Sequence, residues 1–286
     1  MRSKCKARAQ QVPLTDDKGR CLDETAEITE EFNSYFTSVF TTEDLTNVPE
    51  PVKVCGAGCA GVLRDFDISV EDVKGKLLKL RADKSGGPDE LKPRLLLNIL
   101  EEISEPLCLL FNRSLKEGVV PGDWKNANVC PIFKNGSRHL AANYRPVSLT
   151  SQICKVFESL MRDVIVRHLE DNELLKDSQH GFRRGRSCLT NLLTFLDRVS
   201  GCLDEGEAVD VVFLDFAKAF DKVPHHRLSK KLRSHGIDGE VRRWIEQWLS
   251  GRKQRVGIGG VMSSWRGVDS GVPQGSVGYW DRWCCF

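Results

Sequence analysis

The stretch Val209–Pro224, which reads VDVVFLDFAKAFDKVP, constrains the fold of this chain more than any other. Its apolar run, Val211–Leu214, is typical of a buried strand, and the run ends at the carboxylate of Asp215. Burying an unpaired carboxylate is costly, and a bound metal ion would remove that cost. The pattern therefore predicts a buried strand that presents Asp215 to a metal ion.

The composition indicates an ordinary folded protein. The 286 residues suffice for one large domain or two modest ones, and 40% apolar with 29% charged residues argues against wholesale disorder. The net charge of +2 does not by itself indicate a nucleic-acid-binding protein. No apolar run approaches the roughly 20 residues needed to cross a bilayer, and the basic N-terminus lacks a secretory apolar region. We expect an intracellular protein, cytoplasmic or nuclear and not secreted.

The cysteine pattern predicts neither disulfides nor zinc. There are 11 cysteines, and Cys55 and Cys59 form a close pair, but no second pair or histidine cluster completes a zinc site at a recognised spacing. Reduced thiols are expected in an intracellular chain.

Helices are predicted where apolar residues recur every three or four positions. The predicted ranges are 25–40, 69–84, 90–101, 105–118, 153–169, 189–199, 224–236 and 238–249. Ser69 with Asp72 resembles a capping box, and Asp238 is expected to cap the last helix. Trp244 and Trp248 fall on the apolar face of that helix and are predicted to be core residues.

Hairpins are predicted at 124–149 around Asn135-Gly136 and at 252–265 around Gly259-Gly260, and residues 12–24 are predicted to form a short hairpin or a loop. The hairpin at 124–149 places Lys134 and Arg145 on opposing arms. The two side chains could clamp phosphates, or they could simply be solvated.

The loop Gln179–Ser187 combines glycines, arginines and one aromatic residue. Free backbone amides, guanidinium groups and a ring suit a nucleic-acid backbone and a stacked base. Arg183, Arg184 and Arg186 are the candidate nucleic-acid-binding residues, and basic residues outnumber acidic ones from Arg183 to Arg255.

Six of these motifs occur in an order and at spacings that resemble the reverse transcriptase of a non-LTR (LINE-type, jockey or chicken-repeat-like) retrotransposon. The matching stretches are Lys84–Asp89, Trp124–Lys134, Asn143–Leu149, Gln179–Ser187, Asp215–Pro224 and Gly271–Ser276. One such motif alone is weak, but six in order are specific.

The resemblance implies an α+β fold: the fingers and partial palm of a right-hand polymerase, mostly helical with short antiparallel hairpins. The domains implied are an N-terminal extension at 1–60, fingers at 61–200, the first part of the palm at 201–277 and a non-family tail at 278–286. The implied partners are an RNA template, an RNA–DNA duplex and deoxynucleotide triphosphates, with Mg²⁺ as cofactor and no membrane.

The resemblance also implies the roles of single residues. Asp215 would be the catalytic carboxylate and a ligand of both magnesium ions, with the Phe216 carbonyl beside it. Phe220 matches the aromatic gate that excludes a ribose 2′-hydroxyl. The nucleotide-binding residues implied are Lys134, Arg145, Phe220 and Gln274.

The sequence departs from the family pattern after Val277. The family continues to a strand hairpin that carries an aromatic-Ala-Asp-Asp motif, whereas this chain reads GYWDRWCCF and contains no aromatic-x-Asp-Asp. One carboxylate cannot hold two divalent ions, so we expect polymerisation to be lost or nearly lost. We also expect an open sheet edge and uncovered apolar surface beside Asp215.

Three functions stay open at this point. The chain is an inactive reverse transcriptase fragment, a non-catalytic module that binds RNA or an RNA–DNA duplex, or a polymerase completed by another chain. Primer extension separates the third from the first two.

Overall fold

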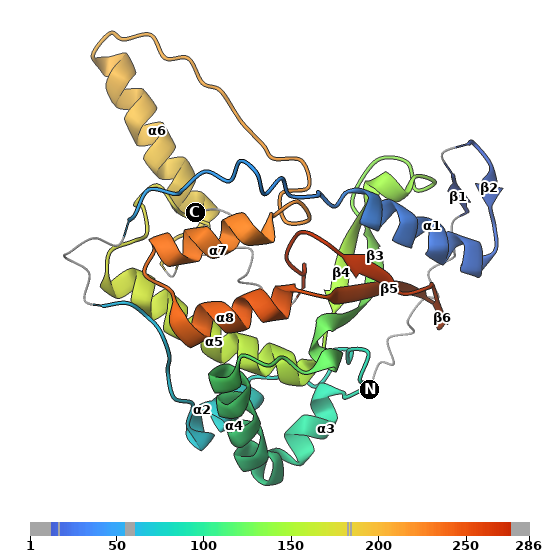
Figure 1. The fold of residues 1–286 in the computed structure, drawn as a ribbon. Coiled ribbons are helices and arrows are strands. Elements are labelled where there is room, and N and C mark those ends of the chain that lie inside the picture. The colour runs from blue at the N-terminus through green and yellow to red at the C-terminus, as the bar shows by residue number, and fades with distance from the viewer. Residues whose placement is uncertain (1–12, 17, 55–60, 182, 184, 276–286) are drawn as a thin grey trace, which may run out of the picture.

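The computed structural model describes residues 13–16, 18–54, 61–181, 183 and 185–275. The basic N-terminus, Cys55, Cys59, Arg184 and the tail from residue 276 onward lie outside the described residues. Figure 1 shows the helices grouped on one side of a small central sheet, with one helix on the opposite side.

The α+β class is confirmed by the helices and strands of the described chain. The helices are α1 (Thr25–Ser38), α2 (Val70–Leu77), α3 (Pro93–Asn98), α4 (Leu100–Glu117), α5 (Gln152–Asp171), α6 (Cys188–Asp204), α7 (His225–Ser234) and α8 (Gly239–Leu249), with 3-10 turns η1 (Gly122–Lys125) and η2 (Ala141–Asn143). The strands are β1 (Leu14–Thr15), β2 (Cys21–Leu22), β3 (Asn126–Phe133), β4 (Tyr144–Leu149), β5 (Arg252–Ile258), β6 (Val261–Met262) and β7 (Arg266–Val268).

The central sheet is mixed. Its strand order is β4-β3-β5-β6, and β7 pairs with the same strand β5. The predicted hairpins are confirmed as the antiparallel pairs β1–β2, β3–β4 and β5–β6. The parallel pairing of β3 with β5, which sets Asn128 opposite Arg255, was not predicted, and it joins two hairpins into one sheet.

The main core lies between α4, α5 and α8 and is rich in aromatic rings. The ring centres of Phe157 and Trp244 are 4.7 Å apart, and Trp244 stacks on Trp248. The Trp244 indole N–H also donates to Ser114 Oγ at 2.9 Å, which satisfies its only donor. Both tryptophans are fully buried, which confirms their predicted core role.

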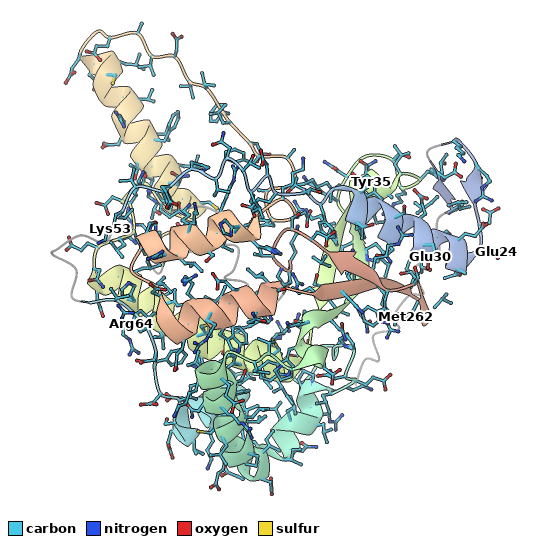
Figure 2. The ribbon with its side chains drawn as sticks, viewed as in Figure 1. Glu24, Glu30, Tyr35, Lys53, Arg64 and Met262 are labelled. Atoms are coloured by element: carbon cyan, nitrogen blue, oxygen red, sulfur yellow. The ribbon has the colours of Figure 1, made fainter. Side chains whose placement is uncertain are left out.

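A second, smaller core forms where α1 packs on the sheet. Phe32 and Phe36 of α1 meet Val129 of β3 and Val256 of β5. Figure 2 shows Glu30 on the side of α1 next to the β5–β6 hairpin, where its carboxylate accepts a hydrogen bond from Ser264 Oγ at 3.0 Å. The amphipathic helix predicted at 25–40 is thus confirmed as a cover for the sheet.

The helix ends follow the predicted signals with three differences, the first being that α2 ends at Leu77 and not near residue 84. The Ser69–Asp72 capping box is present at the start of α2. Asp238 precedes α8 but makes no side-chain cap bond, because its carboxylate accepts from Arg242 at 2.7 Å instead. The boundary between the two helices predicted at 90–101 and 105–118 lies at Ile99 and not near residues 102–104. The second helix, α4, begins at Leu100 and contains Pro106 in its interior.

The strand predicted at 211–214 is wrong. Residues 207–216 form no strand or helix, and Val212, Phe213 and Leu214 are 78%, 87% and 88% exposed. A strand needs a neighbour to satisfy its backbone groups, and no described segment pairs with this one. The preceding helix α6 has an apolar face but buries none of its residues, and Figure 1 shows it extending away from the body.

Candidate functional site

The predicted catalytic residue Asp215 lies on the exposed segment that follows α6. Phe216, beside it, is 82% exposed, so the site here opens to solvent and is not a buried strand end. The chain then turns at Lys218, which adopts a left-handed φ of 55° and places its ammonium 5.3 Å from the centre of the Tyr35 ring on α1. Phe220 is partly buried against the main core.

The residues around Asp215 do not fit a two-magnesium site by themselves. Within the described part of the chain, no group of three or more histidine, cysteine, aspartate or glutamate side chains could hold a metal ion. One exposed carboxylate with a neighbouring carbonyl supplies too few anionic ligands to hold two divalent ions in register.

The predicted clamp residues lie on one face of the β3–β4 hairpin. Arg145 is opposite Ile132, and the Lys134 amide donates to the Asn143 carbonyl at 2.9 Å, which extends the ladder by one step. Because side chains alternate along strands, Lys134 and Arg145 are diagonal neighbours on the same face. Both are exposed, and neither has an ion-pair partner among the residues that the structure describes.

The arginine loop between α5 and α6 is held by one carboxylate. Arg183 and Arg186 both approach Asp177, at 3.6 Å and 3.4 Å, and Arg183 also donates to the Lys176 carbonyl. Arg184 lies outside the described residues. The two described arginines remain partly exposed, so a phosphate could replace Asp177 as their partner.

Two hollows lie beside the turn that follows Asp215. The first, of only about 20 Å³, lies where the loop before Gln274 meets β5, and the second, of about 350 Å³, lies between the 216–224 turn and α7. The second hollow is lined mainly by apolar residues, and its charged lining residues are Lys222, Arg227 and Lys231.

Gln274 is fixed from two sides. Its carbonyl accepts a hydrogen bond from the Ser148 amide on β4 at 2.6 Å, and its side-chain Nε2 donates to Asp221 Oδ1 at 3.0 Å. The structure therefore brings Gln274 into contact with the turn after Asp215 and with the strand that carries Arg145.

Asp221 is the residue of this site that the sequence reasoning left without a role. It is only 7% exposed, and burial raises the pKa of its carboxyl, while Lys218 and the Gln274 hydrogen bond act in the opposite direction. The available signal was a second carboxylate in the same motif, one residue after the aromatic Phe220.

The family model for reverse transcriptase (RNA-dependent DNA polymerase) matches residues 132–278, more than half of the chain. The chain belongs to the reverse transcriptase family. The matched range includes the hairpin clamp, the arginine loop, the Asp215 turn and Gln274, and the LINE-type resemblance is confirmed by the relatives that follow.

This reverse transcriptase chain is similar to curated proteins of insect mobile elements. It is 31% identical over 211 residues to the RNA-directed DNA polymerase from mobile element jockey of Drosophila funebris, a match that covers 73% of this chain and 23% of that protein. It is 29% identical to the probable RNA-directed DNA polymerase from transposon BS of Drosophila melanogaster, with the same two shares. It is 28% identical over 56% of its length to the Pol polyprotein of the R2 element of Popillia japonica, of which it covers 22%.

The chain thus spans less than a quarter of the length of these relatives. Among its described helices, none is long and apolar enough to cross a membrane.

Proposed function

We propose that this chain is the fingers and first part of the palm of a LINE-type reverse transcriptase, and that it binds an RNA template or RNA–DNA duplex without polymerising DNA by itself. The observation that carries the binding half is the hairpin clamp, in which Lys134 and Arg145 share one exposed face without an intramolecular ion pair among the described residues. Unpaired cations on a rigid hairpin suit phosphates better than cations already held by carboxylates.

The arginine loop supports the same function. Arg183 and Arg186 converge on a single carboxylate that is itself 93% exposed, so the ion pairs are weak and exchangeable in water. In the proposed function, phosphates compete with Asp177 for these guanidinium groups, and the incoming triphosphate contacts Lys134 and Arg145.

The inactivity half rests on Asp215. Its segment is exposed and pairs with no described strand, and the described residues contain no group of three or more acidic, histidine or cysteine side chains that could hold a metal ion. A nucleotidyl transfer that depends on two metal ions needs more anionic ligands than this one side chain.

Fluorescence anisotropy with a labelled RNA–DNA duplex tests the binding half. The variant Lys134→Ala/Arg145→Ala should bind more weakly, and the slope of log Kd against log salt should fall by roughly 1.5, the value for two lost phosphate contacts. Lys79→Ala/Arg113→Ala, in the turn after α2 and on α4 of the helical side, removes the same charge and should behave as wild type. Equal losses in the two variants would contradict the clamp.

Primer extension on an RNA template with Mg²⁺ tests the inactivity half. We expect no incorporation above background. Incorporation that Asp215→Asn abolishes would show that the chain is an active polymerase.

A further inference from the structure

The loop Ser270–Gln274 is fastened to the turn Phe220–Val223 by its backbone. The Val272 amide donates to the Phe220 carbonyl and the Gly271 amide to the Val223 carbonyl, each at 2.9 Å. The Ser270 hydroxyl donates to the Asp221 carbonyl at 2.7 Å. With its own carbonyl held by Ser148, Gln274 keeps freedom only in its side chain.

We propose that Asp221 is a positioning residue for Gln274, whose carboxylate fixes which way the Gln274 amide faces. An ionised carboxylate can only accept hydrogen bonds. The amide nitrogen of Gln274 must therefore face Asp221, as it does at 3.0 Å, and the amide oxygen must face away. Asp221 thus selects one of the two orientations of the Gln274 side-chain amide. The two orientations have nearly the same shape, but they exchange the positions of the hydrogen-bond donor and acceptor.

This inference rests on the proposed function, together with the nucleotide-binding role that the family resemblance implies for Gln274. With Asp221 in place, the loop offers a ligand the amide oxygen and the second N–H of Gln274 in a fixed order. An asparagine at position 221 can donate as well as accept, so both orientations of Gln274 become available. The asparagine variant should therefore bind nucleotide more weakly, because a ligand would bind only those molecules in which the Gln274 amide has the correct orientation.

The burial of Asp221 supports a functional reason for its presence. The side chain is 7% exposed, and Gln274 is the partner its carboxylate has in the described structure. A buried carboxylate with one hydrogen bond from a neutral amide and the charge of Lys218 nearby is a poor way to stabilise a fold, because a neutral or apolar side chain would avoid its desolvation cost.

Nuclear magnetic resonance of the protein labelled with ¹⁵N-glutamine tests the orientation directly. In the wild type, one Nε2 proton of Gln274, assigned through its loss in Gln274→Met, should be shifted downfield relative to the exposed Gln247. This measurement needs no variant of Asp221. In Asp221→Asn that shift should disappear, whereas Asp269→Asn, at an exposed carboxylate one residue before the loop, should leave it unchanged.

A titration with a fluorescent deoxynucleoside triphosphate, in the presence of an RNA–DNA primer–template, tests the consequence. Asp221→Asn should raise the Kd by about twofold if the two amide orientations are equally populated, and by up to about tenfold if the non-binding orientation dominates. Asp221→Asn/Gln274→Met should bind no more weakly than Gln274→Met alone, because Asp221 acts through Gln274.

Two results would overturn the inference: a Gln274 amide signal indifferent to Asp221→Asn, or additive losses of affinity in the double variant. If the wild-type protein binds no nucleotide, the proposed function is contradicted. The effect of Asp221→Asn on the Gln274 amide signal would then be the test of the positioning role.

Discussion

At the scale of single residues, the loop before Gln274 depends on polar contacts that a hydrophobic pattern does not specify. His225 Nε2 donates to the Gly271 carbonyl at 2.8 Å, and Ser270 Oγ accepts from the Thr41 amide at 2.9 Å while donating to Asp221. Gly271 itself has a φ of +81°, and a Cβ there would lie 2.7 Å from the carbonyl oxygens of Phe220 and Asp221. The close approach of the two segments thus requires a glycine.

Gly271→Ala should destabilise the protein by about 1–3 kcal/mol, because the new methyl group meets backbone oxygens and the left-handed conformation is strained. Gly122→Ala is the matched control, since its Cβ would meet nothing within 4 Å and its φ is not left-handed. Urea unfolding of both variants measures the difference. Equal midpoints would show that the loop relaxes without cost.

His225 gives the stability a dependence on pH. Burial lowers the pKa of its imidazole below the ordinary 6.5, although the Gly271 carbonyl acts in the opposite direction. The folded state therefore binds fewer protons than the unfolded state between the lowered pKa and 6.5, so the free energy of unfolding should fall as the pH drops through this window. His235 is shifted the same way by burial.

Urea unfolding at several pH values between about 7.5 and about 5 measures this slope. His225→Asn cannot titrate and should give a shallower dependence than wild type. An unchanged slope would mean that other groups, such as His235, account for the whole effect.

At the scale of elements, prediction worked where the signal was local. The 3.6-residue periodicity located α1, α5 and α8, and Asn135-Gly136 located the β3–β4 turn. The parallel pairing of β3 with β5 was not predictable in the same way, because nothing near residues 126–129 specifies residues 253–256 as their partner. Of the candidate site, the hairpin clamp could be predicted from the turn, but the contact of Gln274 with Asp221 joins distant segments.

The strand prediction at 211–214 was wrong for the same reason, because local sequence does not specify the distant segment that a strand pairs with. An apolar run shows that a segment favours burial, but not which residues will cover it. The apolar face of α6 is a parallel case, since the helix forms as predicted while Leu192, Leu193 and Leu196 stay exposed.

Changing these α6 leucines to glutamine should therefore leave the free energy of unfolding within about 0.5 kcal/mol of wild type. The same change should reduce self-association measured by light scattering, because it removes exposed apolar surface. Ile165→Ala in α5, a fully buried site, should instead cost about 2–5 kcal/mol. A comparable loss in the α6 variant would show that the helix is buried in solution.

At the scale of the whole molecule, the protein has two apolar cores, one among the helices and one where α1 packs on the central sheet. The larger core joins α2, α4, α5, α7 and α8, and the smaller joins residues 14–36 to the sheet. The segment after α1 then runs along α7, where Glu43 accepts from the amides of His226 and Arg227 and Glu50 pairs with Lys230. A boundary between residues 60 and 61 stays a prediction, and residues 13–54 contact the rest of the chain at several places.

Phe32→Ala should cost about 3–5 kcal/mol, because the ring packs edge-on against Tyr144 at 4.8 Å and fills the smaller core. Hydrogen exchange should rise first in β3, β4 and β5, since these strands form the other wall of that core, and only later in α4 and α5. Mass spectrometry of exchanged peptides distinguishes the two regions. Uniform loss of protection would mean that the two cores unfold as one unit.

The parallel pair β3–β5 also sets an order of events during synthesis. The β3–β4 hairpin can close as soon as residue 149 is available, but the neighbour on its other side begins only at Arg252. Until then the nascent chain presents β3 as an open edge, which is a template for pairing with other chains. Because such long-range pairing slows folding, we expect this interval to be when the chain most depends on chaperones.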